Sequence, residues 1–351
     1  MTITINKKEY PLYTLDAGAQ ELSKKRWDSI AKPLHSLGKM EDLVIQTAGI
    51  TGDANVTYEK KALIVMCADN GVVAEGVTQS EQNVTAIVSE NFLSDKATAA
   101  ILCKQTGAEI FPIDIGIAVD TKLENHKIAY GTKNMAKEPA MTREEAEKAM
   151  EVGIEKVREL SGQGYKIIAT GEMGIGNTTT SSALASYFLQ EDVEKMTGRG
   201  AGLTSKALEK KIAVVRKAIA DYSPAFTDAI DALAALGGFD IAGMAGVFLG
   251  GAIYRVPIVM DGFISSTAAL TATRICPACK DFIMASHVSK EPAAEKILAA
   301  MGKEAALHCD MCLGEGTGAV TLFPILDLAT QIYEQMSTFE DIEIDAYVEL
   351  K

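Results

Sequence analysis

From Lys61 onward, short apolar runs alternate with longer stretches of helical periodicity. Each run is short and is bounded by polar or glycine-containing segments, which favours a buried strand over a helix. The predicted strands are Ala62–Met66, Glu109–Ile113, Tyr165–Ala169, Val256–Met260 and Phe282–Ala285. Strands separated by helical stretches are typical of a parallel sheet covered by helices, so the pattern predicts the α/β fold class.

Each predicted strand ends in polar residues or glycine. These strand ends carry Asp69–Gly71, Asp114–Gly116, Glu172, Asp261–Gly262 and Ser286–His287. In open α/β sheets, ligands bind beyond the carboxyl ends of the strands. A single polar strand end does not indicate a binding site, because loops are generally polar. Five such ends together predict one shared site.

Helical periodicity predicts the elements between the strands. Thr142–Leu160 begins with a capping box, in which Thr142 caps the helix and Glu145 follows three residues later. A second segment, Gly237–Ala252, is apolar all round and rich in small residues, which predicts a buried helix with close backbone contacts. The other predicted helices are Ser205–Ala220 and a pair on either side of a turn at Lys32–Gly38.

The segment Ile167–Leu184 contains a strand, a glycine-rich turn and the start of a helix. Its glycines are Gly171, Gly174 and Gly176. In this arrangement backbone N–H groups converge on an anion, and Asn177 or Thr178 can cap the helix. Glu172 indicates that the loop also contacts a polar or cationic organic group. A tight turn without a ligand explains the glycines equally well, and no Walker motif is present.

The chain has 351 residues, a net charge of −13 and a hydrophobic content of 48%. It can therefore bury a large core, and its charge argues against nucleic-acid or anionic-membrane partners. An anionic substrate would need local positive charge. The candidate cations are Arg199, Lys206, Lys210 and Lys211. For any single lysine, a solvated helix face is the alternative.

No apolar run reaches the roughly 20 residues of a membrane span, and Met1–Tyr10 is not a signal peptide. Six cysteines without an export signal predict reduced thiols in the cytoplasm. Paired Cys-x-x-Cys motifs can bind zinc, but a predicted strand, a loop and a helix separate the two pairs here. Incidental reduced thiols are therefore the favoured interpretation. The pairs are Cys276 with Cys279 and Cys309 with Cys312, near His287 and His308.

Glu315 stands between two glycines, just before the apolar run Val320–Leu328, which predicts a helix. A carboxylate in a glycine turn at the edge of a buried element is a candidate general base. Burial would raise its pKa toward neutrality, as proton abstraction requires. An ordinary glutamate at a helix N-terminus, interacting with the helix dipole, is the alternative. Position alone leaves both interpretations open.

Read together and in order, these motifs resemble the nicotinate-nucleotide–dimethylbenzimidazole phosphoribosyltransferase family of cobamide assembly. The resemblance extends from residue 32 to about residue 320. The matching segments are KPLHSLGKMEDL, ADNGVVAEGV, GTKNMAKEPAMTREEA, ATGEMGIGNTTTSSAL, TGRGAGL, GGFDIAGMAG, MDGFISSTAAL, ASHVSKEP and CLGEGTGA. The GEMGIGNTT loop and the glycine–glutamate motif are the pieces specific to this family.

The resemblance implies a large domain, residues 55–305, built on a Rossmann-like parallel sheet flanked by helices. Residues 1–54 and 306–351 would form a smaller helical domain. Two copies of the whole chain would form a homodimer. The implied reaction moves 5-phosphoribose from nicotinate mononucleotide to an aromatic lower-ligand base, with inversion at the anomeric carbon. No metal, organic cofactor, nucleic acid or membrane is expected to take part.

The resemblance also assigns roles to individual residues. Glu315 is the implied catalytic base for the acceptor's proton, which must leave one ring nitrogen as the other attacks. The implied acceptor pocket contains Thr78, Ser80, Gln82, Glu172 and Leu313. The implied phosphate and ribose site contains Gly174, Gly176, Asn177, Thr178, Gly200, Gly202, Lys211 and Ser289.

Two departures from the family pattern concern the acceptor. Where the family usually reads Ser-Ala-Tyr/Phe-Pro-Gln, this chain reads TQSEQ at residues 78–82, so the stacking aromatic is absent. Where the family tends to have Arg-Leu, the chain has Cys312 and Leu313. Benzimidazoles, purines and phenols therefore remain open as acceptors, as does a role in a hetero-oligomer. A dinucleotide-dependent oxidoreductase, suggested by the sheet alone, would need a Gly-x-Gly-x-x-Gly turn that ADNGVV lacks.

Overall fold

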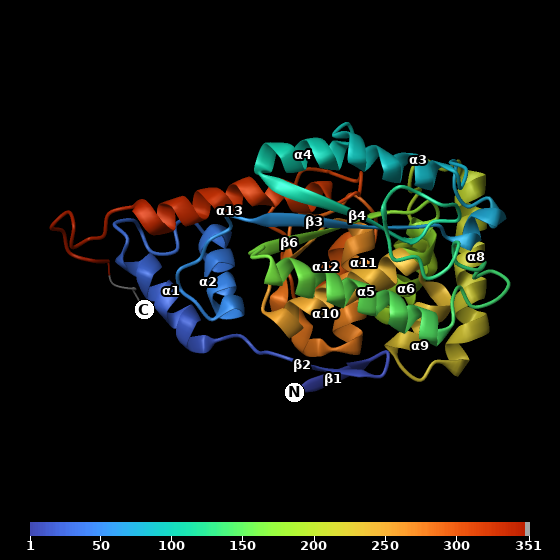
Figure 1. The fold of residues 1–351 in the computed structure, drawn as a ribbon, viewed down its shortest axis with the longest axis horizontal. Helices are drawn as coiled ribbons and strands as arrows, with labels where there is room; N and C mark the ends of the chain where they lie inside the picture. The colour runs from blue at the N-terminus through green and yellow to red at the C-terminus, as the bar shows by residue number, and fades with distance from the viewer. Residues whose placement is uncertain (348–351) are drawn as a thin grey trace.

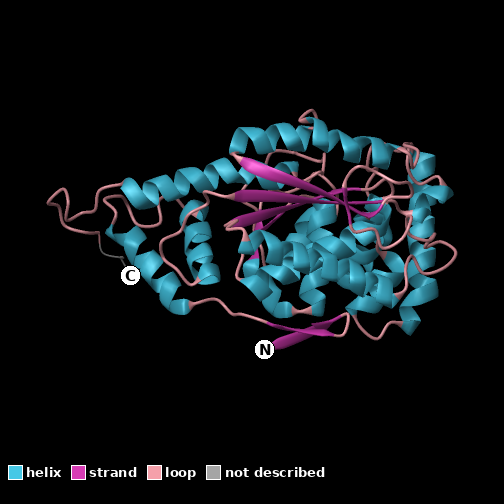
Figure 2. Cartoon of the chain, viewed as in Figure 1, coloured by secondary structure: helices cyan, strands magenta, loops and turns pink. Residues whose placement is uncertain are grey.

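The structure, a computed structural model, describes residues 1–347 and is organised around a six-stranded parallel sheet (Figures 1 and 2). The strand order is β5-β4-β3-β6-β7-β8, and every pair of neighbours is parallel. All five strands predicted from the apolar runs are present, so the α/β fold class is confirmed. The bounds are β3 Lys61–Ala68, β4 Ala108–Gly116, β5 Glu124–Asn125, β6 Ile167–Met173, β7 Ile258–Met260 and β8 Ile283–Ala285.

The chain changes direction across the sheet between β3 and β6. From β3 it proceeds outward through β4 to β5, and it then returns to β6 and proceeds through β7 to β8 on the other side. This is the strand order of a Rossmann-type sheet, in which ligands bind at the point where the order reverses. β3 has a neighbouring strand on each side and is buried over its whole length, which explains why its sequence, KALIVMCA, is mostly apolar.

Helices cover both faces of the sheet (Figure 1). On one face lie α3 (Val84–Asn91), α4 (Thr98–Thr106) and the first part of α13 (Thr317–Gln335). On the other face α10 (Phe239–Tyr254) packs directly on the strands, with α5 (Arg143–Gly162) behind it. The remaining helices of this part are α6 Asn177–Leu189, α7 Val193–Met196, α8 Ser205–Tyr222, α9 Ala229–Leu236, α11 Phe263–Ile275 and α12 Ala294–Ala300. The 3-10 helices are η1 Gly71–Glu75, η2 Phe92–Ser94, η3 Ser223–Ala225 and η4 Pro277–Phe282.

The helices predicted between the strands are confirmed, including the capping box of α5. The Thr142 hydroxyl accepts from the Glu145 N–H at 3.2 Å, and the Glu145 carboxylate accepts from the Thr142 N–H at 2.7 Å. Glycines let α5 and α10 approach closely: a Cβ on Gly246 would lie 1.9 Å from the Met150 carbonyl oxygen. The small residues of α10 thus make close contact possible between two helices.

A smaller group of helices lies at one end of the molecule (Figure 1). It contains α1 (Ala17–Ser29), α2 (Lys39–Thr51) and the C-terminal part of α13. Arg26 joins α1 to α13, because its Nε donates to the Tyr333 carbonyl at 3.0 Å. This arrangement fits a small helical domain, although the division at residues 54 and 305 stays a prediction and residues 348–351 of its C-terminal segment lie outside the described part.

The N-terminal eleven residues were not predicted as structured, yet they form a hairpin of β1 (Thr2–Ile5) and β2 (Lys8–Pro11). The hairpin contacts α5 rather than α1 and α2, through bonds from Asn6 and Lys8 to Glu151. Within residues 1–347, no helix combines the length and apolarity that crossing a membrane requires.

Candidate active site

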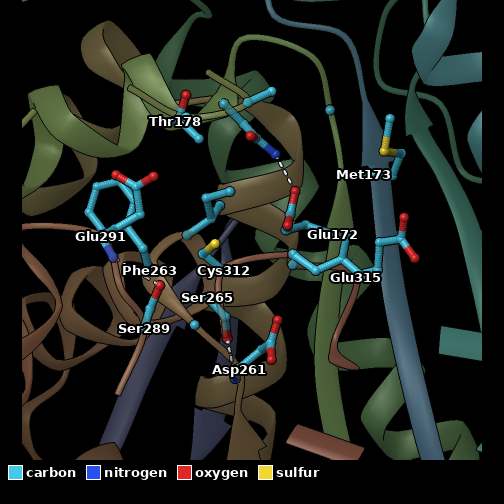
Figure 3. Close-up of a pocket in the computed structure, with 18 of the residues that line it drawn as sticks. Glu172, Met173, Thr178, Asp261, Phe263, Ser265, Ser289, Glu291, Cys312 and Glu315 are labelled. Atoms are coloured by element: carbon cyan, nitrogen blue, oxygen red, sulfur yellow. Dashed lines mark hydrogen bonds between the residues drawn. The ribbon is translucent and has the colours of Figure 1, made fainter. Parts of the chain in front are cut away.

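A cavity of about 460 Å³ lies beyond the carboxyl ends of β6, β7 and β8 (Figure 3). Its walls come from the turns that follow these strands, from the loop around Gly200, from α3 and from the turn before α13. In the view of Figure 3, Glu172 and Glu315 lie on one side of the cavity, and Ser289 and Glu291 lie on the other. Segments far apart in the sequence therefore meet at one edge of the sheet.

The expectation that all five polar strand ends share this site is wrong for β3 and β4. Asp114, after β4, forms a buried ion pair with Lys127 at 2.9 Å. Asp69, after β3, accepts from the Ala118 N–H at 2.8 Å and is buried. Neither residue lines the cavity. These carboxylates fix the loops between β4 and α5.

The glycine-rich turn after β6 brings the backbone into the cavity wall. A Cβ on Gly174 would lie 2.5 Å from the Ala68 carbonyl oxygen and 2.7 Å from Asp240 Oδ2, so only glycine fits there. The predicted capping of α6 by Asn177 or Thr178 is wrong. The N-cap is Gly176, with φ +97°, and it provides no side-chain cap. The Asn177 amide instead bonds two buried carboxylates.

Those carboxylates are Glu172 and Asp240. The Asn177 Nδ2 donates to Glu172 and, at 3.0 Å, to Asp240 Oδ2. Burial, reinforced by the charge of Asp240, raises the pKa of Glu172 to about 8. Burial likewise raises the pKa of Asp240 to about 6. At neutral pH Glu172 therefore holds a proton and can donate a hydrogen bond to a molecule in the cavity.

Glu315 occupies a turn of three consecutive left-handed residues. Gly314, Glu315 and Gly316 have φ values of +90°, +61° and +83°. A residue other than glycine costs about 1–2 kcal/mol in this conformation, so surrounding structure must hold it. Gly171 allows β6 to contact this turn directly. A Cβ on Gly171 would lie only 2.6 Å from the Glu315 carbonyl oxygen, so only glycine permits the contact.

The side chain of Glu315 lines the cavity together with Gly174 and Gly176. Its Oε2 is buried and has no hydrogen-bond partner. Burial is the main reason that the pKa of Glu315 is raised, and a nearby backbone N–H of Ala99 opposes the shift. A half-buried carboxylate with an unpaired oxygen at a cavity wall is able to accept a proton from a bound molecule.

On the other side of the cavity, one lysine reaches the glycine turn from behind. Lys211 on α8 is buried, and its Nζ donates to the Thr178 hydroxyl at 3.0 Å and to the Gly198 carbonyl at 3.1 Å. Burial lowers its pKa to about 8, against the opposing charge of Glu291. Glu291 itself lines the cavity, and its Oε2 is buried without a partner.

The broader cationic patch predicted around Lys211 does not face the cavity. Arg199 donates to the Leu203 carbonyl at 2.6 Å and to the Ser205 hydroxyl at 3.2 Å, so it stabilises its own loop. Lys206 and Lys210 lie on α8 and are absent from the cavity lining.

Most of the residues that the sequence assigned to the site are brought together. Those that line the cavity are Thr78, Glu172, Gly174, Gly176, Asn177, Thr178, Gly200, Ser289, Leu313 and Glu315. Four assigned residues do not line it: Ser80, Gln82, Gly202 and Lys211. Lys211 reaches it only through Thr178. Gly202 is exposed and accepts a bond from Gln79.

The sequence analysis missed Phe263 and Glu291, which line the cavity, and it identified Asp261 and His287 only as strand ends. The signal for the last two was the position after a buried strand. Nothing in the local pattern distinguishes Glu291, because its proximity to Lys211 depends on how α8 packs.

The cysteine pairs differ in exposure. Cys276 and Cys279 are buried, whereas Cys309 and Cys312 are exposed, and Cys312 lines the cavity. Among the described residues, no group of three or more histidine, cysteine, aspartate or glutamate side chains is placed to hold a metal ion.

Comparisons of sequence and structure with known proteins all identify the same kind of enzyme, a phosphoribosyltransferase. A family model described as phosphoribosyltransferase (DBI_PRT) matches residues 12–344. A nicotinate-nucleotide–dimethylbenzimidazole phosphoribosyltransferase from Acetivibrio thermocellus is 48% identical over 330 residues, covering 93% of this chain and 94% of the relative. One from Clostridium acetobutylicum is 49% identical, covering 96% and 97%. The crystal structure of CobT from Thermus thermophilus superposes with a TM-score of 0.89 at 34% identity, covering 93% of this chain and 99% of that one.

Proposed function

The chain belongs to the phosphoribosyltransferase family of the nicotinate-nucleotide–dimethylbenzimidazole enzymes, and we propose that it transfers 5-phosphoribose from nicotinate mononucleotide to a lower-ligand base in cobalamin assembly. The products are an α-riboside phosphate and nicotinate. The main observation behind the proposal is the cavity between the glycine-rich turn after β6 and the Glu315 carboxylate, whose Oε2 has no hydrogen-bond partner. A candidate base and a candidate anion-binding turn therefore line the same cavity.

Glu315 is the proposed catalytic base. A benzimidazole gives the proton of one ring nitrogen to the Glu315 carboxylate while the other nitrogen attacks C1′ of the ribose. The bond from C1′ to the pyridinium nitrogen breaks, and its electron pair stays on nicotinate. Because the leaving nitrogen begins with a positive charge, it departs neutral and needs no acid, metal or organic cofactor.

The glycine-rich turn and its neighbours form the proposed phosphate and ribose site. Backbone N–H groups of Gly174, Gly176 and Gly200 and the Ser289 hydroxyl would bind the phosphate, since preorganised donors fix the ribose for in-line attack. Lys211 would add positive charge through its contact with Thr178. Asn177 orients Glu172, whose protonated carboxyl is placed to donate to the acceptor or the ribose. Gly202 lies outside the cavity, so its proposed contact with the phosphate would require its loop to move.

The acceptor pocket is lined mainly by apolar side chains, which suits a planar aromatic ring. These side chains are Val84, Val88, Met173, Ile175 and Leu313. Thr78 adds a hydroxyl, whereas Ser80 and Gln82 would need loop movement to contact the ring. A benzimidazole is the proposed acceptor, and the same Glu315 would activate a phenol or a purine.

We further propose that the enzyme acts as a cytoplasmic homodimer. Exposed apolar side chains on adjoining helices support a protein contact, because large exposed apolar patches mark interaction sites. They are Ile87, Leu93 and Ile101, which are 63%, 53% and 47% exposed. Light scattering on the purified chain tests the dimer, and a monomer at micromolar concentration would contradict it.

The deciding experiment gives the purified chain nicotinate mononucleotide and a panel of benzimidazoles, purines and phenols, with products identified by mass. We expect Glu315→Gln to lower turnover by about 10²- to 10⁴-fold, the range for losing a general base, while retaining nicotinate mononucleotide binding. Glu343→Gln is the matched control. The backbone of Glu343 also has a positive φ, but this residue is exposed and does not line the cavity. Undiminished turnover in Glu315→Gln would remove the base assignment, and no product with any acceptor would refute the function.

A further inference from the structure

The N-terminus of α13 lacks the side-chain cap that helices usually have. Its N-cap residue is Gly316, which makes no side-chain cap bond. The first N–H groups of a helix have no partners within the helix and must be satisfied from elsewhere. Here a residue from another strand end, Asp261, provides the acceptors.

Asp261 follows β7 and is buried, with 4% of its surface exposed. Its Oδ1 accepts from the Gly318 N–H at 2.8 Å and from the Ala319 N–H at 3.1 Å. Its Oδ2 accepts from the Gly316 N–H at 3.1 Å. One carboxylate therefore binds both the start of α13 and the residue immediately after Glu315.

Asp261 is itself held in place by contacts on two sides. Its N–H donates to the Ser265 hydroxyl at 3.1 Å, and that hydroxyl lies 2.7 Å from the hydroxyl of Thr170 on β6. On the side of β8, His287 Nδ1 lies 3.8 Å from Asp261 Oδ1. The carboxylate is thus fixed relative to the sheet, and the turn that it binds is fixed with it.

We propose that Asp261 is a positioning residue that holds the left-handed Gly314–Gly316 turn and so directs the Glu315 carboxylate into the cavity. This rests on the proposed function, in which Glu315 is the base. Without the Asp261 carboxylate, the Gly316 N–H loses its acceptor and the conformation of Glu315 loses a fixed neighbour. The side chain would then sample positions other than the reactive one.

Asp261 also affects the charge of the base. Burial is the first cause of the raised pKa of Glu315, and the negative charge of Asp261 raises it further. The other titratable groups around the turn are Glu172, from β6, and His287, from the segment after β8. Removing the Asp261 charge therefore lowers the pKa of Glu315, which a purely structural role would not predict.

The test is Asp261→Asn, which preserves size but replaces a charged acceptor with an amide. We expect kcat to fall about 10- to 100-fold, the cost of a small misplacement of a reactive group. The KM for nicotinate mononucleotide should change little, because the phosphate site is separate. The acidic limb of the pH profile of kcat/KM should move to lower pH, because loss of the nearby negative charge lowers the pKa of Glu315.

The control is Asp16→Asn, which makes the same chemical change at the N-terminus of α1, where Asp16 accepts from the Ala19 N–H at 2.9 Å. Its kcat and pH profile should match the wild type. Wild-type kcat in Asp261→Asn would overturn the proposal. A loss of activity with an unmoved acidic limb would also overturn it.

A second measurement does not depend on activity or on the folding of the variant. Hydrogen exchange of the wild type should show protection of the Gly316, Gly318 and Ala319 amides. Fast exchange at these three sites would overturn the proposal on its own. If the wild type transferred phosphoribose to no acceptor, the proposed function would fail, while the exchange data would still test the role of Asp261 in holding the turn.

Discussion

Replacing Gly171 by alanine tests how closely the strand β6 supports the turn that carries Glu315. Gly171 lies in β6, and nothing separates its Cα from the backbone of Glu315 and Gly316. An added Cβ would lie 2.6 Å from the Glu315 carbonyl oxygen, 2.7 Å from its carbonyl carbon and 2.9 Å from the Gly316 nitrogen. All three atoms belong to the backbone, so no side chain can rotate to make room.

The size of the effect follows from these distances. Relieving the contact to an ordinary separation of about 3.4 Å moves the turn by roughly 0.8 Å, starting from 2.6 Å. Inserting a methyl group into a packed site typically costs about 1–3 kcal/mol of stability. A displacement of about 1 Å at a reactive group can cost about 10²-fold in rate. Gly171→Ala should therefore lower kcat by about 10²-fold and destabilise the fold by about 1–3 kcal/mol.

The assay combines steady-state kinetics with urea unfolding, and it uses Gly162→Ala as control. Gly162 is the last residue of α5, and a Cβ there would meet nothing within 4 Å. The control should keep wild-type activity and gain about 0.5–1 kcal/mol, because alanine favours the helix. If Gly171→Ala retained both the kcat and the unfolding midpoint of the wild type, the steric reasoning would be refuted.

Three further predictions concern other parts of the molecule. Lys211→Met should weaken nicotinate mononucleotide binding. It should not lower the unfolding midpoint at pH 7, because burial of the charged lysine opposes folding. In the wild type, binding should weaken as the pH rises past about 8, where Lys211 loses its proton. Titration calorimetry across this pH range checks the binding statements and urea unfolding checks the midpoint, and a midpoint that falls in the variant would contradict the stability argument. Gly246→Ala should cost about 3 kcal/mol in urea unfolding, since its Cβ would lie 1.9 Å from the Met150 carbonyl oxygen. A colorimetric thiol reagent should react quickly with Cys309 and Cys312 and reach the four buried cysteines only after denaturation. Three or more fast thiols would contradict the described burial.

The sequence predicted the central sheet because period and length are local signals. Each of the five apolar runs became a strand, and the capping box of α5 formed as expected. The N-terminal hairpin also has a local signal in the sequence. The alternation in TITI leads into Asn6 and Lys7, both with positive φ, and asparagine is favoured in such turns.

The parts of the site that could not be predicted depend on contacts between distant segments. Asn177 was expected to cap α6, but its amide bonds Asp240, which lies 63 residues later. Asp261 caps α13 from 55 residues away. Local propensity contains no information about such partners. Glu315 could be found because its two glycines indicate an unusual backbone in the sequence itself.

Helix α13 begins beside Glu315 and ends where Arg26 of α1 binds its last carbonyls. Its 19 residues span about 28 Å, and Pro324 lies inside it, where a proline removes one backbone hydrogen bond and favours a bend. The small group of helices that includes α1 is therefore connected to the cavity by a helix that can bend near its middle.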